Sequence, residues 1–123
     1  MTVPKLANAE LAVMERLWQK GAQTARLLRE HLYPDAAKSM HGTIQRLLQR
    51  LEDKGFVHRD RDRAAHLFAP RVSREAYAAG RLEALADQVT GGSFVPLITH
   101  LVEERKLSDA DMERLRRLLE DGS

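Results

Sequence analysis

The clearest pattern in the chain is an apolar stripe between residues 38 and 55. Five apolar side chains recur there with the spacing of one helical face: Met40, Ile44, Leu47, Leu48 and Leu51. The spacing predicts a helix that packs this stripe inward. Ser39 is expected to cap its amino end, and Gly55 suits the left-handed residue just beyond its carboxyl end.

The opposite face of this predicted helix is polar and carries no acid before Asp53. Its members are Lys38, Ser39, Gly42, Gln45, Arg46, Gln49 and Arg50. Guanidinium groups can bond to a guanine edge and glutamine amides to an adenine edge, so this face suits the major groove of DNA. The alternative is that any amphipathic helix has a polar outer face.

The start of the same face favours contact with the DNA backbone. Lys38, Ser39 and the free N–H groups of the first helical turn suit phosphate oxygens. Gly42 costs a helix roughly 1 kcal/mol relative to alanine, and close approach to a duplex would explain it. His41 favours a phosphate or base contact, and Thr43 belongs with the side chains that recognise bases.

A short hairpin with a basic tip is predicted directly after this helix. Residues 56–60 and 66–69 are strand-like, and Pro70 closes the second run. Arg61 and Arg63 occupy the loop between them. A helix followed by such a hairpin is the winged form of the helix-turn-helix, whose wing arginines typically reach phosphate or the minor groove. The alternative is a solvated turn in which Asp60 and Asp62 neutralise the arginines.

Two helices are predicted before the apolar stripe. Asn8 is expected to cap the first, which Gly21 ends, and Thr24 to cap the second, which ends near Pro34. An extended piece near residues 22 and 23 can pair with the wing strands. The order of three helices and a hairpin predicts a mostly helical fold with a winged helix-turn-helix domain in residues 1–72.

Three amphipathic helices are predicted in residues 73–123, beginning near Ser73, Ser93 and Ser108. Helices of this size cannot bury their apolar stripes alone, which favours a helical dimerisation domain and a homodimer. A dimer would place two recognition helices about one DNA turn apart or more on a palindromic site. The predicted dimer contacts are Leu82, Leu85, Leu97, Leu101, Met112, Leu115, Leu118 and Leu119.

The distribution of charge agrees with an anionic partner. The formal net charge is only +2, but residues 38–74 hold nine Lys and Arg against four Asp and Glu. The absence of cysteine excludes disulfides, thiolate metal sites and a cysteine nucleophile. No segment approaches the ~18 apolar residues of a membrane span, and the amino terminus lacks a signal peptide's apolar core. We therefore expect a cytoplasmic protein with no membrane contact.

Catalytic and metal-binding patterns are weak in this chain. Its five histidines lack the spacing of a metal-binding helix, and it has no Gly-rich phosphate loop or nucleophile elbow. His58 and His66 can face each other across the hairpin beside Asp60, although exposed strand histidines are usually surface residues. We expect neither an enzyme nor a cofactor. The competing hypothesis is a winged-helix protein-interaction adaptor without specific DNA binding.

Several segments resemble the penicillinase and methicillin-resistance repressors (BlaI/MecI), a group that includes the copper-responsive CopY repressors. The resemblance runs from about Leu6 to Leu119. It rests on residues 6–18, Thr43-Ile44, Leu47, Arg50-Leu51, Lys54-Gly55-Phe56, and the Gly-Gly-Ser-Phe and Leu-Ser-Asp-Ala-Asp segments of the tail. It implies a dimeric winged-helix repressor that binds an inverted repeat in a promoter, with a carboxy-terminal helical dimerisation domain.

Three departures limit what the resemblance implies. Antibiotic-responsive members carry an Asn-Phe bond that a sensor protease cuts, where this chain has His100-Leu101. A sensor protease or another inducer therefore stays open. The copper-sensing branch has a cysteine-rich tail, whereas this chain has no cysteine, which excludes copper sensing by thiolates. Gly42 stands where some relatives have a long basic residue, so their operator sequence is not carried over.

Overall fold

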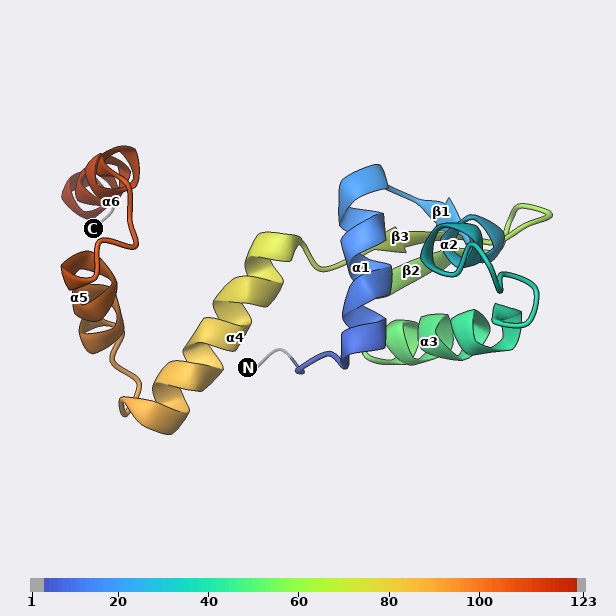
Figure 1. The fold of residues 1–123 in the computed structure, drawn as a ribbon, viewed down its shortest axis with the longest axis horizontal. Coiled ribbons are helices and arrows are strands. Elements are labelled where there is room, and N and C mark those ends of the chain that lie inside the picture. Colours follow the sequence, from blue (N-terminus) through green and yellow to red (C-terminus); the bar gives the residue numbers. More distant parts are fainter. Residues whose placement is uncertain (1–3, 122–123) are drawn as a thin grey trace. The chain divides into compact units, whose positions relative to one another are not determined.

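The structure, a computed structural model, describes residues 4–121. Within them, six helices and a three-stranded antiparallel sheet follow one another in the order predicted for a winged helix (Figure 1). The elements are α1 (Asn8–Lys20), β1 (Gln23–Thr24), α2 (Ala25–Leu32), α3 (His41–Asp53), β2 (Val57–Asp60), β3 (Leu67–Pro70), α4 (Arg74–Val89), α5 (Val95–Glu103) and α6 (Asp109–Asp121). The predicted mostly helical, winged-helix fold is confirmed.

The chain divides into two compact units within α4. The first ends at Arg81 and the second begins at Leu82. The start of α4 belongs with the first unit because Tyr77 packs edge-on against Phe56. The Tyr77 hydroxyl also accepts a hydrogen bond from the Leu6 backbone N–H at 2.9 Å.

The sheet joins the wing to the start of α2. Its strand order is β1-β3-β2, and Gln23 in β1 pairs with Phe68 in β3. This confirms that the extended piece near residues 22 and 23 pairs with a wing strand. The three helices α1, α2 and α3 pack with the sheet around one apolar core. Its fully buried large side chains include Val13, Met14, Leu17, Leu28, Ile44, Leu48, Leu51, Phe56, Val57 and Phe68.

Two of the predicted helix caps are wrong. The Ser39 hydroxyl donates to the carbonyl of Ala36 at 3.0 Å, and α3 begins at His41 without a side-chain cap. Asn8 is the first residue of α1 and not its cap. The N–H of Ala7 instead donates to the Glu10 carboxylate at 2.8 Å, because Glu10 reaches back to the helix start.

Five other predicted helix ends are confirmed, whereas α5 begins at Val95, two residues after Ser93. The hydroxyls of Thr24, Ser73 and Ser108 each accept a backbone N–H three residues later, at 3.2, 3.0 and 3.1 Å. Gly21 and Gly55 follow α1 and α3 with φ of +80° and +82°, a conformation that glycine adopts without strain.

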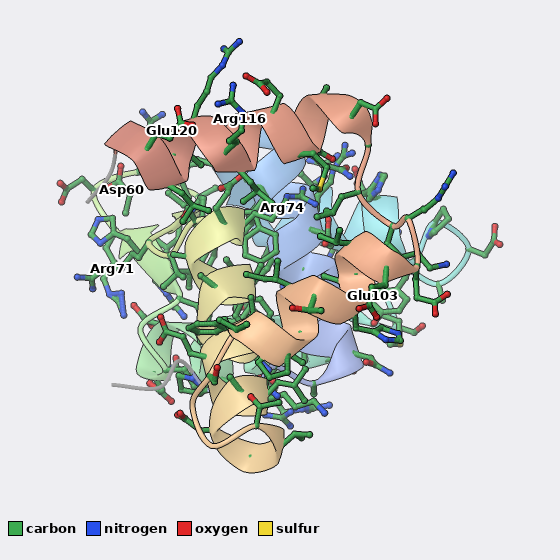
Figure 2. All side chains as sticks on the ribbon, turned by 90° about the vertical axis from the view of Figure 1, so that its left-hand side faces the viewer. Asp60, Arg71, Arg74, Glu103, Arg116 and Glu120 are labelled. Atoms are coloured by element: carbon green, nitrogen blue, oxygen red, sulfur yellow. The ribbon has the colours of Figure 1, made fainter. Side chains whose placement is uncertain are left out.

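The second unit leaves most of its apolar surface open to solvent. Among its described residues, Ala86 is the buried apolar side chain. On α6, Arg116 pairs with Glu113 and Glu120, and Figure 2 labels both Arg116 and Glu120 on this helix. Hydrogen bonds from Arg116 lower the pKa of Glu113 despite some desolvation. The hydrogen bonds to Glu113 and Glu120 raise the pKa of Arg116. No helix within residues 4–121 is long and apolar enough to cross a membrane.

Candidate nucleic-acid interface

Helix α3 is fixed to the scaffold by one apolar face. Ile44, Leu47, Leu48 and Leu51 are buried, whereas Met40, which precedes the helix, is only half-buried. Burying each large aliphatic side chain contributes about 1.5–3 kcal/mol. The side chains of the opposite face are exposed, as predicted: Gln45, Arg46, Gln49 and Arg50.

A partly buried ion pair joins the carboxyl end of α3 to the amino end of α1. The Lys54 ammonium lies 2.9 Å from both carboxylate oxygens of Glu10, which is 1 % exposed. Burial by itself would raise the pKa of Glu10. The hydrogen bonds from Lys54 and the Ala7 N–H, with the charges of Lys54 and Arg50, outweigh burial and lower that pKa below its usual 4.5. The pair therefore positions α3 relative to α1.

Three basic side chains of the polar face, in α3 and just before it, form no ion pair within residues 4–121. In the part of the chain that the structure describes, no carboxylate forms an ion pair with Lys38, Arg46 or Arg50. The Arg46 guanidinium has one weak contact, a 3.4 Å hydrogen bond to the hydroxyl of Thr43. These three cations are free to meet an anionic ligand.

The amide side chains on this face have local partners. His41 Nε2 and Gln45 Nε2 lie 3.2 Å apart, so the neutral imidazole can accept from the Gln45 amide. Gln49 is held at both ends: its Nε2 donates to Asp53 Oδ1 at 2.9 Å, and its Oε1 accepts from Arg59 at 3.3 Å. Gln49 is therefore more tightly restrained than Gln45.

The arginines of the wing loop, residues 61–66, both have carboxylate partners. Arg63 lies 3.4 Å from Asp60, and Arg61 lies 3.3 Å from Glu52 on α3. The backbone N–H of Asp62 donates to Asp60, and this bond, outweighing slight desolvation and aided by Arg63, lowers the pKa of Asp60. Local neutralisation thus occurs for Arg63. Both guanidiniums stay more than half exposed, where ion pairs are readily exchanged. Figure 1 shows the loop between β2 and β3 projecting from the sheet.

The start of α2 also borders this surface, which the hydrophobic pattern did not predict. A cleft of about 570 Å³ runs between the start of α2, the first turns of α3 and the wing loop. Arg26, His41, Gln45 and His66 line it, and Arg26 pairs with Glu30 at 3.0 Å. The Thr24 cap is the sequence signal that pointed to a helix start here, where backbone N–H groups favour phosphate.

Arg59 is a further member of this surface that was not predicted from the sequence. This side chain is 13 % exposed, and its guanidinium carbon lies 4.8 Å from the centre of the Phe68 ring. Its Nη2 lies 3.2 Å from the Glu52 carboxylate. Alternation along a strand places Arg59 on the same face as the buried Val57, so the pattern contained the signal.

The hairpin histidines do not form a metal site. No group of three or more His, Asp or Glu side chains among residues 4–121 could hold a metal ion. His58, Asp60 and His66 therefore do not come together as such a set. His66 instead lines the cleft beside α2.

The chain was compared with known families and proteins. Residues 6–121 match the penicillinase repressor family. A transcriptional regulator BlaI of Mycobacterium tuberculosis is 36 % identical over 118 residues, which cover 94 % of this chain and 83 % of that protein. The methicillin resistance regulatory protein MecI of Staphylococcus aureus (strain N315) is 28 % identical over 94 % of this chain and 93 % of that protein. The penicillinase repressor of Bacillus licheniformis is 22 % identical, over 97 % and 92 %.

These matches span nearly the whole chain and agree with the winged-helix fold. They confirm the resemblance stated from the sequence and the prediction of a transcriptional repressor rather than an enzyme. The chain belongs to the penicillinase repressor family, a family of DNA-binding transcriptional repressors.

Proposed function

We propose that this repressor binds a palindromic promoter operator as a homodimer. One observation carries the proposal: α3 exposes Arg46 and Arg50 on the face opposite its buried apolar stripe, and no carboxylate among residues 4–121 pairs with either. A helix held in this way can enter a major groove with its guanidiniums ready to bond to guanine edges.

Each side chain of the interface has a proposed role. The contacts to base edges are His41, Thr43, Gln45, Arg46, Gln49 and Arg50, with Gly42 allowing close approach. The contacts to phosphate or the minor groove are Lys38, Ser39, Arg61 and Arg63. We add Arg26 to the phosphate contacts, because it lines the cleft that α3 and the wing loop share. DNA phosphates would replace Glu30 as its partner.

The homodimer is supported by the exposed apolar surface of the second unit. Among the proposed contacts, Leu82, Leu85, Leu101, Met112, Leu118 and Leu119 are exposed, and Leu97 and Leu115 are half-buried. Exposed large apolar side chains in this number are costly in water and are typical of a protein–protein contact. A twofold dimer would also match the symmetry of a palindromic operator.

An adaptor that binds only proteins is the competing function. It would account for the fold and the apolar second unit. It would not account for Lys38, Arg46 and Arg50 standing without carboxylate partners among residues 4–121. An adaptor would be retained on DNA weakly and without sequence preference, whereas a repressor would show a steep salt dependence from counterion release.

We further propose that the repressor acts in the cytoplasm, where it can reach promoter DNA, and that an inducer releases it. A sensor protease that cuts between His100 and Leu101 would first have to unwind α5, because that bond lies within the helix. The His100 carbonyl accepts the N–H of Glu104 at 2.9 Å, and the Leu101 carbonyl accepts that of Lys106. The inducing signal is therefore not assigned to proteolysis at this bond.

The experiment that tests the proposal is a fluorescence-anisotropy titration of Arg46→Ala. We expect base preference to fall by about 1–3 kcal/mol at one position per half-site. Lys20→Ala, an exposed cation at the end of α1, is the control and should keep the preference. An Arg46→Ala variant with unchanged affinity and preference would contradict the assignment.

A further inference from the structure

We propose that Glu52 is a specificity-determining residue that acts by positioning Gln49 and the wing, an inference that rests on the proposed function. Glu52 belongs to α3, the helix proposed to enter the groove, where a carboxylate repels phosphate. By charge alone, a carboxylate at this location would lower the affinity for any duplex, so we looked for a positioning role in its contacts. Its contacts identify what it does.

The Glu52 carboxylate connects α3 to strand β2 and to the wing loop. One oxygen, Oε1, lies 3.2 Å from Nη2 of Arg59 on β2. The other, Oε2, accepts a hydrogen bond from Nη2 of Arg61 in the wing loop at 3.3 Å. A single side chain thus sets where the wing loop lies relative to the recognition helix.

The same cluster fixes the orientation of the Gln49 amide. Arg59 Nη2 donates to Gln49 Oε1 at 3.3 Å, while Gln49 Nε2 donates to Asp53 at 2.9 Å and weakly to Glu52 at 3.5 Å. A free glutamine can rotate its amide to match either a donor or an acceptor on a base. A Gln49 held in one orientation presents one pattern, which favours one base edge over others.

Arg59 depends on Glu52 because it is poorly solvated. Its side chain is 13 % exposed and lies over the Phe68 ring, and its Nε is buried without a partner among the described residues. Glu52 itself is 24 % exposed and carries the only charge that the structure places against Arg59 within residues 4–121. Removing that charge would leave Arg59 to relocate, and Gln49 would lose the hydrogen bond that holds its carbonyl end.

The test compares Glu52→Gln with Glu30→Gln in the full-length protein. Each variant removes one negative charge on the proposed DNA-binding side and frees an exposed arginine, Arg61 or Arg26. Only Glu52 contacts Gln49. Anisotropy titrations use a duplex selected from a random pool and a scrambled duplex of the same length. We expect Glu52→Gln to reduce the ratio of selected to scrambled affinity about tenfold, and Glu30→Gln to leave that ratio unchanged.

The outcomes separate positioning from simpler roles. If both affinities rise together in Glu52→Gln, the residue only repels phosphate and the inference is wrong. If both fall together, its role is structural, which also overturns the inference. Adding Gln49→Ala to Glu52→Gln should cause no further loss of preference, and a full additional loss would refute the coupling.

Two further measurements keep the test interpretable. Asp53→Ala removes the acceptor that holds the other end of Gln49 and should lower the same ratio, even if Glu52→Gln impairs folding; an unchanged ratio would contradict the inference. The wild-type protein is titrated alongside. A wild type without sequence preference would overturn the proposed function itself, whereas a normal wild type with an unaffected Glu52→Gln ratio would overturn only the role of Glu52.

Discussion

Replacing Gly42 with alanine should stabilise the free protein and weaken its binding to DNA. Gly42 lies in the first turn of α3, exposed and without a positive φ. An added Cβ would meet only the flexible end of Arg46, at 3.9 Å. Alanine is better than glycine in a helix by about 0.8–1 kcal/mol. For a unit the size of this winged helix, that gain raises Tm by about 4–8 °C.

Binding should change in the opposite direction. If the missing side chain lets the α3 backbone approach the duplex, a methyl group there separates the two surfaces. Forcing an extra methyl into a close contact typically costs about 1–3 kcal/mol. That cost corresponds to roughly a 5- to 150-fold loss of affinity. A stabilised protein that binds DNA less well is an outcome that a purely structural glycine would not give.

Both quantities can be measured on the same samples. Trp18 is the only tryptophan, it lies in the first unit, and its indole N–H donates to the Val72 carbonyl at 2.9 Å. Its fluorescence therefore reports unfolding of the winged helix, while anisotropy of a labelled duplex reports binding. Gly55→Ala is the control and should lower Tm, because Gly55 has a φ of +82°. A Gly42→Ala variant with a lower Tm, or with full affinity, would refute the explanation of Gly42.

Three further predictions concern the core, the wing and the dimer. The pKa of Glu10 is lowered by folding, so its contribution to stability is full above about pH 4.5 and is lost as pH falls through the lower folded-state value. Glu10→Gln should lower the free energy of unfolding by about 2 kcal/mol at pH 7. Urea unfolding followed by Trp18 fluorescence should then show a smaller loss of stability below pH 4.5 than in the wild type; an equal loss would contradict this. Arg63→Ala should weaken all duplexes alike and reduce the salt slope by about one, and a loss confined to the selected site would argue against a phosphate contact. Leu118→Glu should give monomers in sedimentation, and an intact dimer would place the interface elsewhere.

Local periodicity is why the fold could be predicted. The apolar stripe from Ile44 to Leu51 matches one helical face, and the structure buries it. Gly21 and Gly55 mark helix ends because few other residues adopt positive φ without strain. With these elements in order and short connections between them, few topologies remain.

The partners of charged side chains could not be predicted in the same way. The amino end of α1 is capped by Glu10 and not by Asn8, because the Glu10 carboxylate is held by Lys54, 44 residues away in the sequence. Arg61 donates a hydrogen bond to Glu52 and not to the neighbouring aspartates, because the hairpin folds back towards α3. Such pairings depend on the tertiary arrangement, so the sequence identified the polar face of α3 but not which of its members are restrained.

The most direct test of the account is selection of bound duplexes from a random pool by the full-length protein, followed by sequencing. We predict an enriched inverted repeat whose half-sites lie about one helical turn apart or more, as two copies of α3 in a twofold dimer require. Enrichment of a single asymmetric half-site would contradict the dimer. A pool that emerges without any enriched sequence would contradict specific recognition by the exposed face of α3.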